Sequence, residues 1–257
     1  MSHYRFTTIL ITFFLEIGCS VSTRVPTEQI VLNTMGPISI EVDSFGGDVT
    51  ITADESSSNT VVTLEKRIVQ ELDLEDLSKW ITCNTAARST TIGQEVVVQT
   101  SAMNNELGFM RVDITIVANS IENVQVKTRS GDVVLRGISG ELNIRTSDGN
   151  ILVATSEPMT ESVSIENHRG DIIYRISPES SGVVEITAIG GGAHLDAMLG
   201  SVNILPGTTK GYLLAILNGG QNSISLRTVD GDARVEVLKY PMSTRATWNF
   251  DWLPFIQ

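Results

Sequence analysis

The residues whose types and spacing best suit chemistry carry a side-chain oxygen and follow a glycine at intervals along the chain. They are Asp48, Asp132, Asn150, Asp171 and Asp232. If the turns that carry them stacked, their oxygens would form a column, and Ca²⁺ binds several such ligands at once. Gly192 and Lys210 hold the equivalent place in two other units and interrupt that column. Because Asp and Asn favour tight corners, turn chemistry explains these residues, and we expect no metal site.

Catalytic patterns are missing around the two histidines of the mature chain, His168 and His194. The sequence contains neither Gly-x-Ser-x-Gly nor His-Glu-x-x-His. Basic residues that could serve as a base or charge stabiliser, as in β-helix polysaccharide lyases, are Lys127, Arg129, Arg136, Arg145 and Arg169. Nothing in the sequence singles one of them out. We therefore expect no catalytic residue and no cofactor.

An integrin-type tripeptide occurs at Arg169-Gly170-Asp171. The same corner recurs elsewhere as Ser-Gly-Asp and Asp-Gly-Asp. The tripeptide is therefore explained by the turn that the chain repeats, and we do not expect it to bind a host cell.

Residues 1–18 resemble a secretory signal peptide. Arg5 gives a positive start, and residues 9–15 form an apolar run that is too short for a bilayer, which takes about 20 residues. The Gly-Cys pair ending at Cys19 resembles the cleavage junction of a bacterial lipoprotein, although Glu16 stands where that pattern has leucine. We expect an exported protein of the cell envelope with lipid attached at Cys19.

The second cysteine, Cys83, leaves two alternatives open. If Cys19 carries lipid, Cys83 stands alone and is expected to be a small buried apolar residue. Otherwise a Cys19–Cys83 disulfide could form in an oxidising compartment, and the protein would be secreted or periplasmic and soluble. Because no other apolar run is long enough to span a membrane, we expect attachment through an N-terminal lipid only.

Charge and composition exclude several kinds of partner. The formal net charge of −12 argues against nucleic acid, whose binding relies on Lys and Arg, and against charge-driven binding to anionic lipid. Aromatic residues make up only 5% of the chain. A thin core of Val, Ile and Leu needs few aromatics, so this composition favours stacked β coils.

A repeat of about twenty residues organises the chain. Each unit has an alternating strand, a glycine corner and a second alternating strand, and the units begin at Ile40, Val124, Leu142, Val163, Val184, Val202 and Ile224. The eighth residue is glycine in six of these seven units, and only the Val202 unit, with Thr209, differs. Since no unit can bury a core alone, we predict that they stack as a parallel β-solenoid. A β-sandwich of hairpins, which Asp-Gly turns also favour, is the alternative.

Within the unit at Leu142, alternation predicts which side chains face the core. Leu142, Ile144, Ile151 and Val153 are expected to point inward, and Asn143, Arg145 and Leu152 outward.

Outside the repeats, the two ends of the chain differ from the middle. We expect a tether at 19–37, an N-terminal β region at 38–120 with a short helix near 72–81, repeats at 121–240, and a cap or tail at 241–257. In the last segment Trp248, Phe250 and Trp252 alternate and would share one face of a strand. They either cap the last coil or form an exposed strip that contacts a partner.

The repeats resemble a known family. The strings VKTRSGDVVLRGISGELNIRTSDGNILV and SLRTVDGDARVEV are similar to the bacterial adhesin-like family of domain-of-unknown-function type called DUF4097, over about residues 38–240. This resemblance implies an exported or membrane-anchored β-solenoid, and it brings no catalytic residues with it.

The sequence thus favours a non-catalytic, adhesin-like surface or envelope module that presents regular β faces to a protein or polysaccharide. One alternative is a structural or regulatory envelope component that pairs with another membrane protein. The other is a carbohydrate-active β-helix enzyme.

Overall fold

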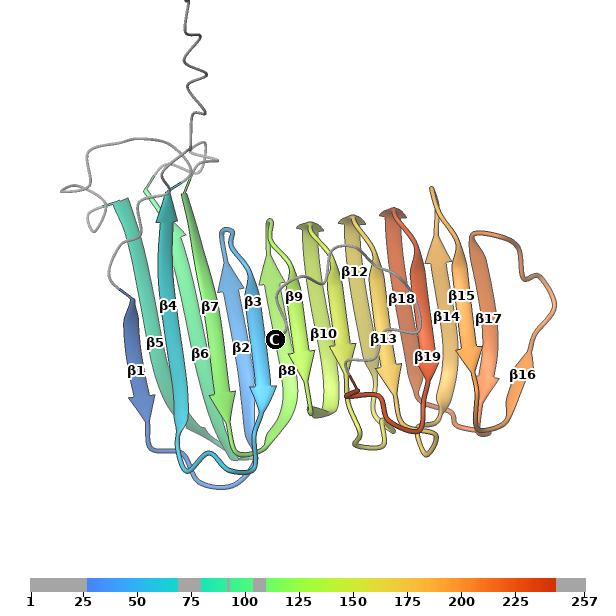
Figure 1. Cartoon of the computed structure of the whole chain (residues 1–257), viewed down its shortest axis with the longest axis horizontal. Coiled ribbons are helices and arrows are strands. Elements are labelled where there is room, and N and C mark those ends of the chain that lie inside the picture. Colours follow the sequence, from blue (N-terminus) through green and yellow to red (C-terminus); the bar gives the residue numbers. More distant parts are fainter. Residues whose placement is uncertain (1–26, 69–79, 92, 104–109, 244–257) are drawn as a thin grey trace, which may run out of the picture.

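The computed structural model describes residues 27–68, 80–91, 93–103 and 110–243, and its named elements are strands in two sheets (Figure 1). Sheet A has the spatial order β1 (Glu28–Leu32), β4 (Thr60–Ile68), β7 (Met110–Ala118), β3 (Val49–Ala53), β9 (Val133–Arg136), β11 (Ile151–Ala154), β13 (Ile172–Ile176), β19 (Ala233–Val237) and β15 (Ala193–Ala197). Sheet B has the order β16 (Val202–Ile204), β17 (Tyr212–Leu217), β14 (Gly182–Ala188), β18 (Ser223–Asp230), β12 (Val163–Arg169), β10 (Ser139–Asp148), β8 (Ile121–Thr128), β2 (Ile38–Ser44), β6 (Gly93–Ala102) and β5 (Ile81–Thr90).

Each central repeat forms one coil, with its first strand in sheet B and its second in sheet A. In the unit at Leu142, β10 pairs in parallel with β8 and β12, while β11 pairs in parallel with β9 and β13. Equivalent residues therefore stack, as Ile144 does between Val126 and Ile165. The hairpin alternative is wrong because the two strands of a unit lie in opposite sheets and do not pair with each other.

The order of the coils in space departs from their order in the chain at both ends. The coil of β2 and β3 lies between β6/β7 and β8/β9, although β6 and β7 come later in the sequence. The coil of β18 and β19 likewise lies between β12/β13 and β14/β15 (Figure 1). The repeat pattern predicted stacking but carried no information on which coils are neighbours.

Antiparallel strands extend both sheets at one end of the stack and sheet B at the other, where sheet A ends on the parallel strand β15. At one end β1 pairs with β4, β4 with β7, and β5 with β6; at the other, β17 pairs with both β14 and β16. Residues 28–32, expected to belong to the tether, form β1. The Val202 unit, the one without the corner glycine, is the source of β16 and β17. The helix expected near 72–81 falls mostly on residues outside those described.

The core lies between the sheets and consists mostly of aliphatic side chains from both, with Tyr174 fully buried among them. Leu142, Ile144, Ile151 and Val153 lie in it as predicted, each at most 1% exposed. Leu152 points to the other side of its strand but is only 2% exposed, so the outer surface of sheet A is covered at this place.

Candidate functional site

The glycine corners connect sheet B to sheet A and pack directly on one another. Gly149 has φ +120°, and a Cβ there would lie 2.2 Å from the carbonyl oxygen of Gly131. A Cβ on Gly170, which has φ +119°, would lie 2.2 Å from the carbonyl oxygen of Gly149. Only glycine accommodates this backbone and this approach. The corners thus form one continuous edge of the molecule.

The Asp and Asn residues after these glycines form a hydrogen-bonded series, which we call the Asx column: Asp48, Asp132, Asn150, Asp171 and Asp232. Each side-chain Oδ1 accepts the backbone N–H of the next member, at distances of 2.9, 2.7, 3.0 and 2.8 Å in that order. Asp232 in turn accepts the N–H of Gly192 at 2.7 Å.

We expected Gly192 and Lys210 to interrupt this column, and that expectation is wrong because the coils do not stack in their order along the chain. The coil of β18 and β19 lies directly beside that of β12 and β13, so Asp232 follows Asp171 and Gly192 comes at the end. Within the described residues, no group of three or more His, Cys, Asp or Glu side chains is arranged to hold a metal ion.

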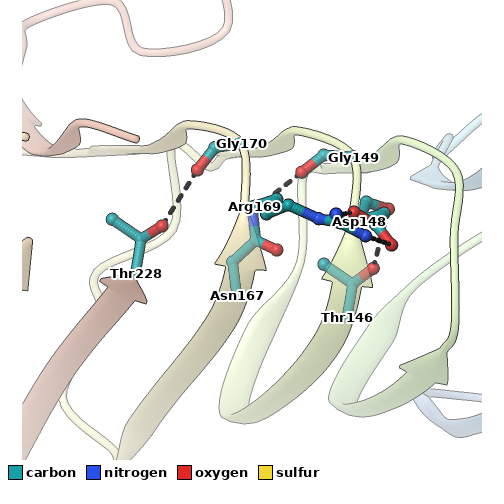
Figure 2. A network of polar contacts seen from close by, with 7 residues as sticks. All are labelled: Thr146, Asp148, Gly149, Asn167, Arg169, Gly170 and Thr228. Carbon is teal, nitrogen blue, oxygen red and sulfur yellow. Dashed lines mark hydrogen bonds and ion pairs between the residues drawn. The ribbon is translucent and has the colours of Figure 1, made fainter. Parts of the chain in front are cut away.

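Polar side chains at the ends of the sheet B strands support the corners from inside (Figure 2). The Thr146 hydroxyl donates to the carbonyl of Asp148 at 3.1 Å, and the Asn167 amide donates to that of Gly149 at 2.7 Å. Thr228 makes the equivalent bond to Gly170 at 3.0 Å. The bonds from Asn167 and Thr228 satisfy glycine carbonyl groups of the neighbouring coil, whereas the Asp148 carbonyl also accepts the Gly131 N–H at 3.0 Å.

The Arg169-Gly170-Asp171 tripeptide is held within this edge. Arg169 binds Asp148 of the preceding coil through both Nε and a terminal nitrogen, the latter at 2.7 Å from Oδ2 (Figure 2). The hydrogen bond from Arg169 lowers the pKa of Asp148 below its ordinary value. Because Asp171 also belongs to the Asx column, both charged residues of the tripeptide have structural partners.

Basic side chains gather on the outer face of sheet B. Lys127 on β8 is in register with Arg145 on β10, Arg145 with Glu166 on β12, and Glu166 with Arg227 on β18. All four side chains are exposed. Arg145 pairs with Glu166 at 3.5 Å, a contact between exposed groups that water screens. We call Lys127, Arg145 and Arg227 the basic row.

Other basic residues named from the sequence divide between this face and the opposite one. Arg129 and His168 are exposed two residues beyond the basic row, and Arg169 lies at the adjoining corner. Arg136 instead lies on the outer side of sheet A, where burial and then the charge of Arg175 lower its pKa. Sequence reasoning overlooked Arg227, although it holds the fourth position of its repeat, as Lys127 and Arg145 do in theirs.

A shallow depression of about 290 Å³ lies at the strand-start side of the same face. Its lining includes Glu41, Glu95 and Glu141, together with Asn123. Asn123 has φ +67° at a bulge of β8, and its side-chain oxygen accepts the N–H of Glu141 at 2.8 Å. Sheet B therefore presents an acidic region beside the basic row.

Several residues predicted to be functional lie outside the described part of the chain. These are Cys19, Trp248, Phe250 and Trp252. Cys83 is described, lies half-buried on β5, and has its thiol pKa raised by burial. Within the described residues no helix has the length and apolar character to cross a membrane.

Comparisons with known proteins agree with this fold. The solved structure of a "putative cell adhesion protein" from Clostridium sporogenes is similar to this chain, with a TM-score of 0.58 and 12% identity. The similarity covers 84% of this chain and 100% of that protein. A "putative adhesin" of Bacteroides fragilis covers 83% of this chain and 97% of its own, with a TM-score of 0.29 and 10% identity. The first likeness supports the fold alone, and no curated protein matches the chain. Because the family model described as Toastrack DUF4097 matches residues 4–236, the chain belongs to that family.

Proposed function

We propose that this protein is an exported, non-catalytic, adhesin-like module that binds an anionic protein or glycan through the outer face of sheet B. The observation that carries this proposal is the basic row, in which Lys127, Arg145 and Arg227 lie exposed on β8, β10 and β18. Parallel strands lie about 4.8 Å apart, so Lys127 and Arg145 stand on adjacent strands, while Arg227 lies two strand spacings from Arg145, beyond Glu166 on β12.

The electrostatic contrast with the rest of the molecule supports this assignment. The chain has a formal net charge of −12, so a cationic strip on it attracts anionic groups locally while the remaining surface repels them. Such a surface favours a partner that presents charge in a defined pattern over a uniformly anionic one. The names of the structural neighbours, which refer to adhesion, fit a surface-binding role.

Attachment to the envelope through lipid on Cys19 belongs to the same proposal. A palmitate analogue should label the wild-type protein in its native cells, and Cys19→Ala should abolish the label. Cys83→Ala is the matched control and should retain it. Equal labelling of the two variants would refute attachment at Cys19. An unlabelled wild type would do the same, and it would favour the soluble alternative.

The binding role is tested with purified residues 27–257 and immobilised partners. Acidic polysaccharides, neutral polysaccharides and envelope proteins should be compared at two salt concentrations. We expect saturable binding to an acidic partner that weakens as salt rises, because exposed charges are screened. Binding that is confined to neutral glycans and unaffected by salt would refute the basic row as the site, and breakdown of a polysaccharide would refute a non-catalytic role.

A further inference from the structure

Within the described part of the chain, one edge of sheet B is long and unprotected. The strand β5 ends sheet B at the same end of the stack where β1 ends sheet A (Figure 1). Its ten residues, 81–90, pair with β6 in an unbroken antiparallel register without a bulge. The strand contains no proline, and Arg88 is its only charged residue. Because proteins use bulges, prolines and charges to block edge strands, β5 is open to pairing with a further strand.

The other edges of the two sheets are shorter than β5. β1 and β15 have five residues each, and β16 has three. β15 carries His194 and Asp196, and β1 carries Glu28. Short and charged edge strands resist pairing with another chain. The contrast identifies β5 as the edge that another strand can join.

The backbone groups that β5 leaves unpaired belong to its odd-numbered residues. The carbonyl of Trp80, directly before the strand, accepts the N–H of Met103 at 2.9 Å, and this pair continues the register of β5 with β6. Residues of an antiparallel strand alternate between its two sides, so the even-numbered residues of β5 bond to β6. Within the described residues, no backbone hydrogen bond is made on the other side of β5. The N–H and C=O groups that point to this edge are those of Ile81, Cys83, Thr85, Ala87 and Ser89.

We propose that β5 pairs in antiparallel fashion with β5 of a second copy of this chain, about a two-fold axis at Thr85. In this register Thr85 lies opposite Thr85 of the second copy, Cys83 opposite Ala87, and Ile81 opposite Ser89. No other antiparallel self-pairing of β5 gives a partner to every N–H and C=O group of the edge. The Thr85 hydroxyl has no hydrogen-bond partner among the described residues. At the axis it meets the same hydroxyl of the second copy, and facing threonines stabilise paired strands.

The side chains of β5 suit this register. Residues 86–90 are exposed, so the edge is accessible along this half of the strand. On the outer side of the sheet, Thr82 lies opposite Arg88 of the second copy, so the arginine faces an uncharged residue. The two arginines are separated by six residues of strand, or about 20 Å. A two-fold contact of this kind closes on itself, and it leaves no β5 edge open for a third copy.

Such pairing makes sheet B continuous across two chains. A two-fold axis perpendicular to the sheet keeps its outer face on the same side in both copies. The two basic rows then face the same way, so a partner with repeated anionic groups that spans both would bind with increased avidity. The pairing itself lies at the end of the stack and does not depend on the proposed binding role of the basic row.

Cysteine cross-linking tests this register with the full chain in its native cells. In a Cys83→Ala background, Thr82→Cys and Arg88→Cys together place two thiols opposite each other, with Cα atoms about 4.5 Å apart, a distance that a disulfide spans. We expect mild oxidation to give a covalent dimer, with residues 82 and 88 joined in mass spectrometry. Each single variant holds its thiol about 20 Å from that of its copy and should give several-fold less dimer. The Cys83→Ala chain alone reports any cross-link through Cys19.

The molecular mass of the unsubstituted chain gives a second test. In detergent, light scattering should give the mass of two copies, and this result decides the question should the cysteine variants fail to fold. Ala87→Pro removes an edge N–H and leaves the bonds to β6 in place, so it should give a single copy with unchanged circular dichroism. A double variant that forms no more dimer than the single variants would overturn the proposal. So would a single-copy mass for the unsubstituted chain, or a cross-link that joins β5 to another protein.

Discussion

Asp171 and Asp232 are 61 residues apart in the chain, yet the Oδ1 of Asp171 accepts the backbone N–H of Asp232 at 2.8 Å. This bond joins the coil of β12 and β13 to the coil of β18 and β19. In space the latter lies between β12/β13 and β14/β15, although it comes after both in the sequence. The Asx column therefore connects corners that are neighbours in space, whatever their separation in sequence. The side chains of the column therefore hold neighbouring corners together.

The bond between these two residues depends on an oxygen acceptor and does not require a charge. Asp171→Asn keeps the oxygen, as Asn150 does naturally in the same column, and should change the free energy of unfolding by less than about 0.5 kcal/mol. Asp171→Ala leaves the N–H of Asp232 without its acceptor and should cost about 1–2 kcal/mol. Urea unfolding measures both. Equal losses for the two variants would indicate that charge, and so a bound cation, matters at this column.

The corner glycines should be among the least replaceable residues. A Cβ on Gly149 would lie 2.2 Å from the carbonyl oxygen of Gly131 and would sit on a backbone with φ +120°. Gly149→Ala should therefore lower the free energy of unfolding by about 3 kcal/mol or more. Gly207 also has a positive φ, +99°, but a Cβ there would meet nothing within 4 Å. Gly207→Ala should cost only about 1 kcal/mol. Comparable losses at the two sites would contradict close packing of the corners.

The buried ion pair on sheet A should respond differently from an exposed pair on sheet B. The side chains of Arg175 and Glu236 are 7% and 3% exposed, so Glu236→Ala leaves a buried cation and should cost about 3–5 kcal/mol. Replacing both, with Arg175→Met and Glu236→Leu, should recover much of that loss. Glu166→Ala, which removes the partner of exposed Arg145, should cost at most about 1 kcal/mol. A double variant as unstable as Glu236→Ala would refute this account.

Asp148 should titrate below the ordinary range because its hydrogen bond to Arg169 favours the charged carboxylate. A lowered folded pKa contributes stability above the ordinary value of 3.8, and that contribution is lost as pH falls through the folded value. Arg169→Gln should move the pKa of Asp148 back up, as followed by NMR of the carboxyl carbon. Asp54, whose pKa is lowered by Ser56, provides the control and should not change. An unmoved Asp148 would show that Arg169 is not the cause.

Sequence reasoning succeeded where the physics is local. Positive φ at the corner, alternation in the strands and the need to share a core all lie within one repeat, so the inward residues Ile144 and Ile151 could be predicted. The order of the coils could not, because the strands of every coil present similar inward aliphatic residues to their neighbours. The interruption assigned to Gly192 was wrong for that reason.

The candidate site could be predicted from the sequence only in part. Lys127 and Arg145 could be named from the sequence, but their placement in one row needed the parallel register of β8 and β10. Arg136 could not be separated from them, because its different environment depends on which sheet its strand joins. Leu152 and Ile173 are each only 2% exposed although alternation places them on the outer side of sheet A, so their burial could not be predicted from one repeat.

The central claim, that the basic row is the binding face, is tested most directly by two triple variants with opposite changes in charge. One combines Lys127→Ala, Arg145→Ala and Arg227→Ala. The other neutralises exposed acids of the same sheet, with Glu122→Gln, Glu141→Gln and Glu185→Gln. Affinity for the acidic partner found in the binding comparison should fall about tenfold or more in the first, which corresponds to about 1.4 kcal/mol, and should hold or rise in the second. Unchanged affinity in the first variant, with its fold intact, would contradict the account.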